Sequence, residues 1–229
     1  MKQQKNESVK IMELDNYIEQ IKPLDEDAVN AAWAHWDSLC KPLRGMGRLE
    51  EMVAQLAGIY GTAQLGEVAD LKPVVVIMGA DNGVVAEGVS QTGSEVTAQV
   101  LENMGDRKSS VCIMSRQMGI EVIPVNIGMF VDGQHPRIWN RVVRYGTANM
   151  AKEPAMSREE AIQAIETGIQ VVKDLYEAGH RMIITGEMGI GNTTPSSAMA
   201  AVLLDKDVAE VTGRGAGLSS AGLEHKIEV

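Results

Sequence analysis

The chain has 229 residues, enough for one sizeable domain, and carries 31 acidic against 21 basic residues for a formal net charge of −10. Together with a pI near 4.9, this charge argues against nucleic acid or an anionic membrane as a partner. Apolar residues make up 45% of the chain, aromatic residues only 3%, and there are 14 methionines. The core must therefore be built from aliphatic and thioether side chains.

The sequence predicts a cytoplasmic protein. Its N-terminus, MKQQKNESVK, lacks the apolar centre of a signal peptide, and no run approaches the roughly 18 apolar residues of a membrane span. Cys40 and Cys112 lie far apart, which favours two reduced thiols over a disulfide. The histidines and cysteines show no metal-ligand spacing, so no metal or other cofactor is expected.

Hydrophobic patterns and capping residues predict alternating helices and strands. Helices are expected over Ile11–Ile21, from the cap Asp25 to Leu39, from the turn Lys41–Met52 to Ile59, from Ser94 onward, over Ser109–Met118, from the Ser157–Glu160 capping box to Glu177, over 196–204, and from Ser219 or Ser220 onward. Strands are expected over Lys72–Met78, Val122–Ile127 and Met182–Thr185, with an edge strand within 142–146. Strands that alternate with helices predict an α/β protein with a mostly parallel, three-layer, Rossmann-like sheet and helices on both faces.

The stretch Arg181–Ala198 carries the clearest functional signal. After its strand come three glycines, two candidate N-cap threonines and a proline suited to the first helical position: Gly186, Gly189, Gly191, Thr193, Thr194 and Pro195. Free N–H groups and a helix dipole at one point predict an anion site, most naturally for phosphate. Glu187 would repel a phosphate there, so it is expected to face a ring or a proton. The alternative is an ordinary strand-to-helix turn.

Two other segments could face a ligand. Asp81-Asn82-Gly83 follows the first strand, and ligands in open α/β sheets sit at the carboxyl ends of strands. The turn Lys41–Met52 contains cations that could meet an anion, although a solvated basic turn is equally compatible. The patterns of dinucleotide-binding proteins, Walker nucleotide-binding loops, metal-dependent phosphoribosyl pyrophosphate enzymes and serine hydrolases are absent.

Several motifs occur in the order typical of one family: KPLRGMGRLEE, VVVIMGADNGVVAEGVS, EVTAQ, GTANM with PAM, TGEMGIGNTTPSSAM and GRGAGLSSAGLEHK. From Lys41 to Val229 the chain resembles the nicotinate-nucleotide–dimethylbenzimidazole phosphoribosyltransferase family of cobalamin biosynthesis. The resemblance implies transfer of 5-phosphoribose from nicotinate mononucleotide to 5,6-dimethylbenzimidazole or a similar base. The products would be alpha-ribazole 5′-phosphate and nicotinate.

This chemistry suits a metal-free site, because the leaving pyridinium is already cationic and departs as a neutral ring. The sugar carbon becomes oxocarbenium-like, and the attacking base must lose a ring proton to a carboxylate. The resemblance implies a catalytic position for Glu187, close to the reacting centre. It implies phosphate or nucleotide binding by Gly189, Gly191, Asn192, Thr193, Gly215 and Lys226, and base binding by Asp81, Asn82 and Thr92, with the EVTAQ region near the base.

The chain departs from the family pattern in three places. Asn82 replaces a histidine, the turn Lys41–Gly47 lacks a serine, and the R-L-G-E-G-S-G motif is absent. That motif carries the glutamate taken as the general base, and it lies in about a hundred further residues of the family, so the chain is expected to be C-terminally incomplete.

The resemblance also implies an organisation in two parts. Residues 1–65 would contribute to a small helical domain and residues 66–229 would form the nucleotide-binding domain, in a homodimer. Two alternatives stay open, a non-catalytic protein that binds the nucleotide or the base, and a subunit completed by a related chain.

Overall fold

A computed structural model describes residues 14–68 and 71–229. The chain divides into two compact units, residues 1–71 and 72–229. Of the helix expected around Ile11–Ile21, residues 14–19 are helical, whereas residues 11–13 lie outside the described residues.

The first unit is a small helical assembly. Its helices α2, α3 and α4 span Glu26–Ser38, Arg48–Tyr60 and Leu65–Val68. The side chain of Asp25 accepts a hydrogen bond from the backbone N–H of Ala28, so the predicted cap of α2 is confirmed. Small buried side chains, Ala32 on α2 with Ala54 and Ala57 on α3, let the two helices approach closely.

The cations of the turn before α3 are engaged within the first unit. Lys41 Nζ lies 2.9 Å from Oε1 of the fully buried Glu50, and this hydrogen bond is the main reason why the pKa of Glu50 lies below its usual value. Arg44 pairs with Asp37 at 2.6 Å and stacks 3.9 Å from the ring centre of Trp33. The turn is thus ordered by internal ion pairs, and the anion contact expected of it stays a prediction.

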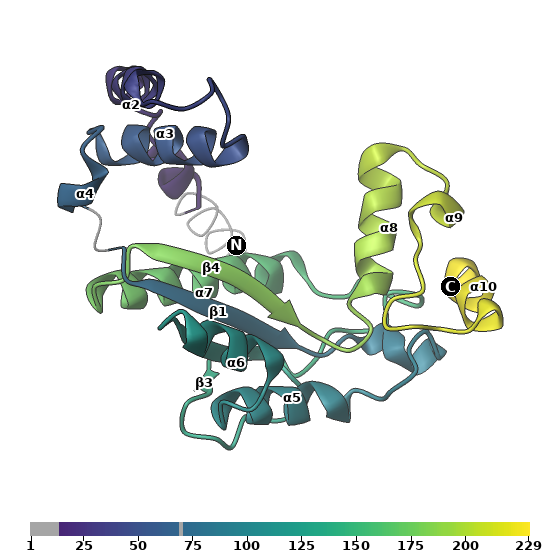
Figure 1. Cartoon of the computed structure of the whole chain (residues 1–229). Coiled ribbons are helices and arrows are strands. Elements are labelled where there is room, and N and C mark those ends of the chain that lie inside the picture. Colours follow the sequence, from purple (N-terminus) through teal and green to yellow (C-terminus); the bar gives the residue numbers. More distant parts are fainter. Residues whose placement is uncertain (1–13, 69–70) are drawn as a thin grey trace, which may run out of the picture. The chain divides into compact units, whose positions relative to one another are not determined.

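The second unit contains a four-stranded parallel sheet in the order β3-β2-β1-β4 (Figure 1). The strands β1, β2, β3 and β4 span Pro73–Ala80, Glu121–Gly128, Trp139–Asn140 and Met182–Met188. The central strand β1 is a nearly continuous buried run, as expected for a parallel strand covered on both faces. The predicted parallel α/β class is confirmed.

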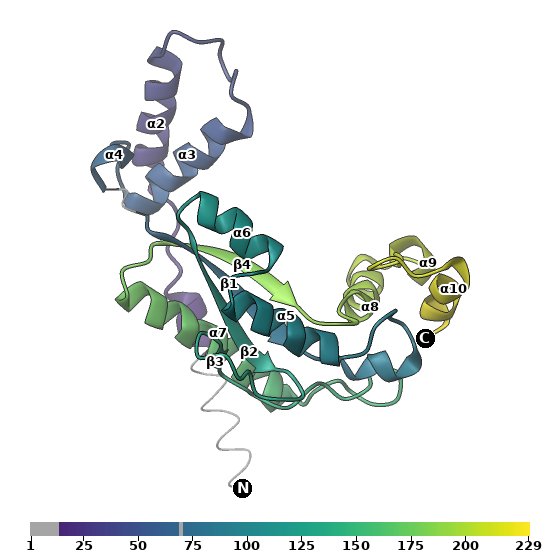
Figure 2. The ribbon, with the colours of Figure 1, turned by 60° about the horizontal axis from the view of Figure 1, so that its bottom comes forward.

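Alternate residues of β1 face opposite layers. The covering helices α5, α6 and α7 span Glu95–Gly105, Ser110–Gln117 and Arg158–Glu177. Val74 and Val76 pack with residues of α7, whereas Val75 and Ile77 pack with residues of α5 and α6. Figures 1 and 2 show α7 on one face of the sheet and α5 and α6 on the other. The predicted three layers are therefore present.

Replacing Leu175 with alanine is expected to lower the free energy of unfolding by about 2–5 kcal/mol. Leu175 is 1% exposed in the core between α7 and the sheet, so its removal leaves a cavity. Chemical denaturation would measure the loss. The matched control Val172→Ala, on the same helix at a position 48% exposed, should change stability by less than about 0.5 kcal/mol. Similar losses in both variants would contradict this packing.

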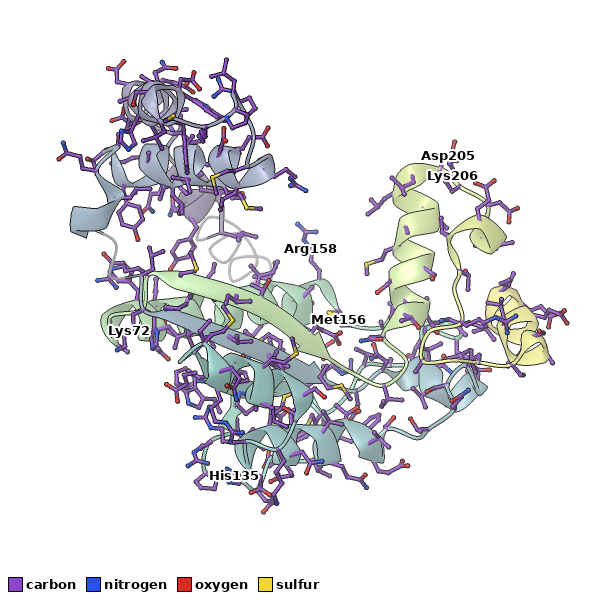
Figure 3. The ribbon with its side chains drawn as sticks, viewed as in Figure 1. Lys72, His135, Met156, Arg158, Asp205 and Lys206 are labelled. Atoms are coloured by element: carbon purple, nitrogen blue, oxygen red, sulfur yellow. The ribbon has the colours of Figure 1, made fainter. Side chains whose placement is uncertain are left out.

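The ends of α7 follow the sequence pattern. Ser157 and Glu160 form the predicted capping box, and Ala178 is the C-cap before Gly179. Lys72, labelled in Figure 3, donates from Nζ to the carbonyl oxygen of Ala178 at 2.7 Å. A cation at the C-terminus of α7 is favourable for the helix dipole and ties this end of the helix to the start of β1.

The edge strand is not where the sequence predicts it. It lies at Trp139–Asn140 instead of within 142–146. The reason is a long-range polar contact, because the buried Asn126 of β2 donates from Nδ2 to Asn140 Oδ1 at 3.0 Å. Residues 142–146 then run past the end of β2 but bend away at Gly146, whose φ is +71°.

The strand and helix around the glycine stretch are longer than predicted. β4 continues to Met188, so Glu187 lies in the strand and not in a loop. Helix α8, Thr193–Leu204, has Asn192 as its N-cap residue, and therefore neither Thr193 nor Thr194 is the cap and Pro195 is not the first helical residue. Pro195 still lies in the first turn, where its missing N–H costs no helical hydrogen bond.

The remaining elements are short. They are the 3-10 helix η1, Gly83–Glu87, and the helices α9, Val208–Val211, and α10, Ser220–Glu228. Ser219 caps α10 by accepting from the N–H of Gly222. Both cysteines are free, as predicted, with Cys40 exposed and Cys112 buried. Within residues 14–68 and 71–229, every helix is too short or too polar to cross a membrane.

Candidate active site

The carboxyl ends of the neighbouring strands β1 and β4 position the glycine stretch. Asn82, just beyond β1, donates from Nδ2 to the carbonyl of Ile190 at 3.1 Å. The hydroxyl of the fully buried Thr97 on α5 accepts from the N–H of Ile190 at 3.1 Å. The loop between β4 and α8 is therefore held from two directions. Thr97 belongs to the EVTAQ region, and in the structure it fixes this loop.

Two backbone donors of the loop are available to a ligand. The N–H groups of Asn192 and Thr194 bond to the carbonyls of Gly189 and Gly191. By contrast, the N–H groups of Gly191 and Thr193 have no acceptor in the described part of the chain. They lie at the N-terminus of α8, where the helix dipole favours an anion.

The loop between β4 and α8, with Gly189 and Gly191, is the first of two glycine bends at this site. The second, at Gly215, lies against the first turn of α8. Gly215 has a φ of +56°, and a Cβ at this position would lie 2.9 Å from Thr193 Oγ1 and 3.6 Å from Lys226 Nζ. A side chain at this position would be strained by the backbone conformation and would crowd Thr193. The bend thus brings the backbone of Gly215 to within reach of Thr193 and Lys226, and phosphate binding by these residues stays a prediction.

Three segments line a cavity of about 320 Å³ in this region. The first covers 89–92, the second 188–193, and the third includes 214–216 and Leu218. The cavity therefore brings together all of the expected phosphate-binding residues except Lys226, together with Thr92 from the expected base site.

Lys226 supplies the buried cation beside this cavity. It is only 3% exposed, and its Nζ donates to Thr193 Oγ1 at 2.7 Å and to the carbonyl of Gly213 at 3.1 Å. Burial lowers the pKa of its ammonium group. Within the described residues these two bonds use two of the three ammonium protons, so one remains for an anion at the Gly215 bend.

Glu187 lies next to the anion site but does not line the cavity. Its Oε2 accepts from Asn192 Nδ2 at 2.5 Å, which uses the side chain that could otherwise have capped α8. Partial burial raises the pKa of the Glu187 carboxyl group, although the hydrogen bond from Asn192 opposes this effect. A carboxylate with a raised pKa at a strand end can take up or release a proton.

The expected base-binding residues are not brought together. Thr92 lines the cavity described above, whereas Asn82 lines a separate apolar groove. Asp81 is 2% exposed; its Oδ2 accepts from the N–H of Phe130 at 2.8 Å, and its Oδ1 has no partner among the described residues. The consecutive residues Asp81 and Asn82 thus have different surroundings, since Asp81 is buried beside Phe130 and Asn82 lines the apolar groove.

Sequence reasoning missed the apolar groove, which has a volume of about 680 Å³. Its walls come from α8 and from the segment 147–156, including Met156, which Figure 3 labels. Val202 and Leu203 on α8 are 82% and 81% exposed. The signal was present in the sequence, because AMAAVLL gives α8 no polar face.

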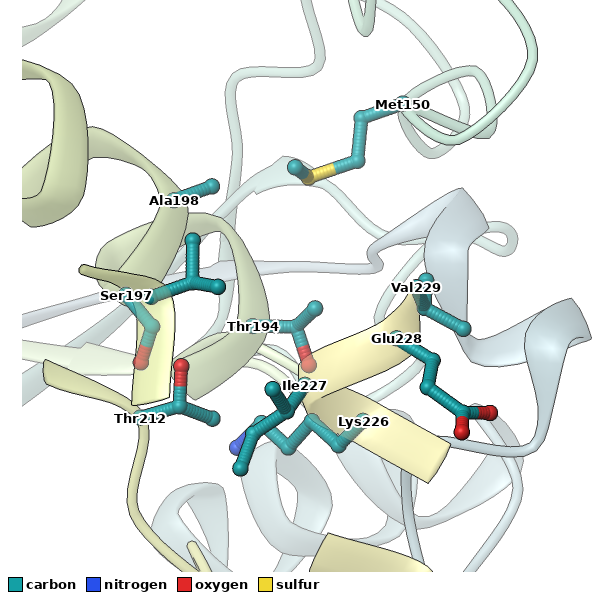
Figure 4. Close-up of a pocket in the computed structure, with 10 residues that line it drawn as sticks. Met150, Thr194, Ser197, Ala198, Thr212, Lys226, Ile227, Glu228 and Val229 are labelled. Atoms are coloured by element: carbon teal, nitrogen blue, oxygen red, sulfur yellow. The ribbon is translucent and has the colours of Figure 1, made fainter. Parts of the chain in front are cut away.

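A further hollow of about 320 Å³ lies between α8 and α10 (Figure 4). Hydroxyl groups of Thr194, Ser197 and Thr212 line it, together with Lys226. The Thr194 hydroxyl is buried without a hydrogen-bond partner among the residues that the structure describes.

Replacing Gly189 with alanine is expected to lower the free energy of unfolding by about 1–3 kcal/mol. A Cβ there would collide with the carbonyl oxygen of Ala80 and lie 2.9 Å from Glu187 Oε1. Thermal unfolding would measure the change. Gly213→Ala is the matched control, because a Cβ at Gly213 meets nothing within 4 Å. Equal stabilities for the two variants would contradict the close packing of the glycine stretch.

The fold defines a class of parallel α/β protein with a candidate anion site at the N-terminus of α8, and comparison with known proteins identifies the family. A family model described as "Phosphoribosyltransferase" (DBI_PRT) matches residues 21–229, so the chain belongs to this phosphoribosyltransferase family.

Particular relatives carry a more specific name, nicotinate-nucleotide–dimethylbenzimidazole phosphoribosyltransferase. Those of Ruminiclostridium cellulolyticum and Clostridium tetani are 46% and 42% identical to this chain, over 95% and 93% of its length. A crystal structure of CobT from Thermus thermophilus is 36% identical, with a TM-score of 0.80 over 88% of this chain and 60% of that one. The chain spans 61% and 58% of the two relatives, or about three fifths of their length.

Proposed function

We propose that this chain carries the nucleotide-binding part of a nicotinate-nucleotide–dimethylbenzimidazole phosphoribosyltransferase. The reaction transfers 5-phosphoribose from nicotinate mononucleotide to 5,6-dimethylbenzimidazole or a similar base, in cobalamin biosynthesis. The products are alpha-ribazole 5′-phosphate and nicotinate. The observation that carries the proposal is the convergence of two glycine bends, the N-terminus of α8 and the buried Lys226 at one point.

In this proposal the 5′-phosphate lies between the two glycine bends. Gly191 and Thr193 donate their free N–H groups, and Gly189 and Gly215 let the backbone approach the phosphate closely. Lys226 donates its remaining proton and supplies the countercharge. A local cation and aligned N–H groups bind an anion even though the chain as a whole is acidic.

Glu187 and Asn192 face the ribose and the reacting base. The raised pKa of Glu187 suits a group that handles a proton during transfer. The family resemblance assigns the general base itself to a glutamate of the R-L-G-E-G-S-G motif, which this sequence lacks. Much of the remaining rate enhancement comes from holding both rings in line with the sugar carbon.

Thr92, Asn82 and Asp81 remain the proposed base-binding residues, although only Thr92 lines the cavity of the anion site. Thr92 shares the cavity of the phosphate-binding residues, which supports its place beside the nucleotide. Asn82 presents an amide in place of the family's histidine and does not titrate near neutral pH. Asp81 contributes the unpartnered Oδ1 at the carboxyl end of β1, within the part of the chain that the structure describes.

The direct test is a single-turnover assay of the chain supplied with the family's R-L-G-E-G-S-G segment, with nicotinate mononucleotide and 5,6-dimethylbenzimidazole as substrates. Chromatography with mass detection should show alpha-ribazole 5′-phosphate and nicotinate appearing in equal amounts. Saturable binding of the mononucleotide without product would favour the alternative, a non-catalytic nucleotide-binding protein. Absence of both binding and product would contradict the proposal.

The assembly and location of the protein are also proposals. We place the protein in the cytoplasm as a homodimer, with residues 1–65 in a small helical domain. The exposed apolar residues of α8 support association with a second copy. Light scattering on the purified chain should give twice the 24.7 kDa mass, and co-purification of a related chain would instead indicate a mixed assembly.

A further inference from the structure

Two of the three segments that line the cavity at the anion site form walls that are far apart in sequence. One is the segment 89–92, which follows η1 and carries Thr92. The other belongs to the segment 213–218, which leads into α10 and Lys226. Figures 1 and 2 show α10 beside the part of the chain that follows β1. Thr92 of the proposed base site therefore faces Gly215 of the proposed phosphate site across one cavity.

One hydrogen bond joins these walls directly, and a second joins the elements next to them, η1 and α10. His225 Nε2 lies 2.5 Å from the backbone carbonyl oxygen of Glu87, and Gln91 Nε2 donates to the carbonyl of Gly217. Since a carbonyl oxygen can only accept, His225 must carry its proton on Nε2 in this contact. His225 directly precedes Lys226 on α10, so its bond to Glu87 also restrains the position of the phosphate-binding cation.

Glu87 is itself anchored, which makes its carbonyl a fixed point. Its carboxylate accepts from Lys152 Nζ at 2.9 Å and from Asn149 Nδ2 at 2.5 Å. These two hydrogen bonds, with Lys152 the stronger influence, lower the pKa of Glu87 and keep it ionised. Gly88, with a φ of +75°, lies next to the His225 ring: a Cβ there would be 3.9 Å from Nε2.

We propose that the contact between His225 and Glu87 couples the two substrates, so that occupancy of the phosphate site strengthens binding of the base. The inference rests on the proposed function and adds a positioning residue, His225, to that site. Because Glu87 is anchored, a phosphate that orders Lys226 and α10 fixes the segment 213–218 against the segment 89–92 through this bond. The base then binds a wall that is already ordered and loses less conformational entropy.

The coupling is measured with a pair of ligands that cannot react. Ribose 5-phosphate occupies the phosphate site but has no leaving base, and 5,6-dimethylbenzimidazole occupies the base site. Isothermal titration gives the Kd of the base for the chain alone and at saturating ribose 5-phosphate. The ratio of the two values should be about fivefold or more, and the reverse titration should give the same ratio.

His225→Leu removes the donor and should lower this ratio clearly, although the bond from Gln91 to Gly217 remains, without lowering the melting temperature appreciably. His225→Gln keeps an N–H donor at a similar reach and should retain most of the ratio. The matched control is Glu224→Gln, an exposed neighbour on α10, which should behave like the unsubstituted chain.

The outcomes separate this inference from the proposed function. If the unsubstituted chain binds both ligands with a ratio of one, or if His225→Leu keeps the full ratio, the coupling is refuted and the proposed function stands. If the unsubstituted chain binds neither ligand, the proposed function fails and the coupling fails with it.

Discussion

Replacing Lys226 with methionine is expected to weaken binding of nicotinate mononucleotide by about 10- to 100-fold. The ammonium group is buried beside the Gly215 bend and supplies a charge-assisted hydrogen bond to the phosphate, worth about 1.5–3 kcal/mol. Methionine fills a similar volume in this buried position without the charge. Isothermal titration of the purified chain would measure the Kd.

The control for this variant is Lys206→Met. Lys206 lies on the surface beyond α8, where its ion pair with Glu210 at 3.4 Å contributes little. We expect its Kd for the mononucleotide to match that of the unsubstituted chain. An unchanged Kd in the Lys226 variant would remove this lysine from the phosphate site.

Replacing Glu187 with glutamine is expected to lower kcat by about 100-fold or more while changing the affinity for the mononucleotide far less. Glutamine can still accept the hydrogen bond from Asn192, so the geometry of the loop is kept and only the proton-transfer capacity is lost. Steady-state kinetics of the chain supplied with the family's R-L-G-E-G-S-G segment, with both substrates varied, would separate kcat from KM.

Glu177→Gln is the matched control. Glu177 is exposed at the end of α7, before β4 begins, whereas Glu187 lies near the carboxyl end of β4. The control should leave both kcat and KM unchanged. Equal losses of turnover and phosphate affinity in the Glu187 variant would show that its carboxylate acts through the structure of the loop. The proposed role at the reacting centre would then be wrong.

The layers of the second unit could be predicted because their signals are local. The run Val74–Ile77 is buried from both faces, and the capping box at Ser157 and Glu160 marks the start of α7 within four residues. Such signals depend on side chains that are neighbours in sequence, so a pattern of burial and capping is enough to find them.

The misplaced elements depended on contacts that sequence spacing does not reveal. The edge strand lies at Trp139–Asn140 because Asn140 pairs with the buried Asn126. Helix α8 lacks a side-chain cap because the Asn192 side chain bonds to Glu187 on the strand before it. In both cases a polar side chain takes a tertiary partner instead of the local one that the pattern favoured.

The candidate site was predictable to different degrees. The strand, glycine and helix order around Gly189 and Gly191 indicated an anion site from local chemistry alone. The contributions of Gly215 and Lys226 came from the family resemblance, and the structure places both beside Thr193. The contact between His225 and Glu87 had no sequence signal, because the two residues are 138 positions apart.

The most direct test of the account is a crystal structure of the chain bound to nicotinate mononucleotide. We predict phosphate oxygens within about 3 Å of Lys226 Nζ and of the N–H groups of Gly191 and Thr193. A phosphate bound elsewhere, for example in the hollow between α8 and α10 in Figure 4, would contradict the central claim that these two glycine bends hold the nucleotide.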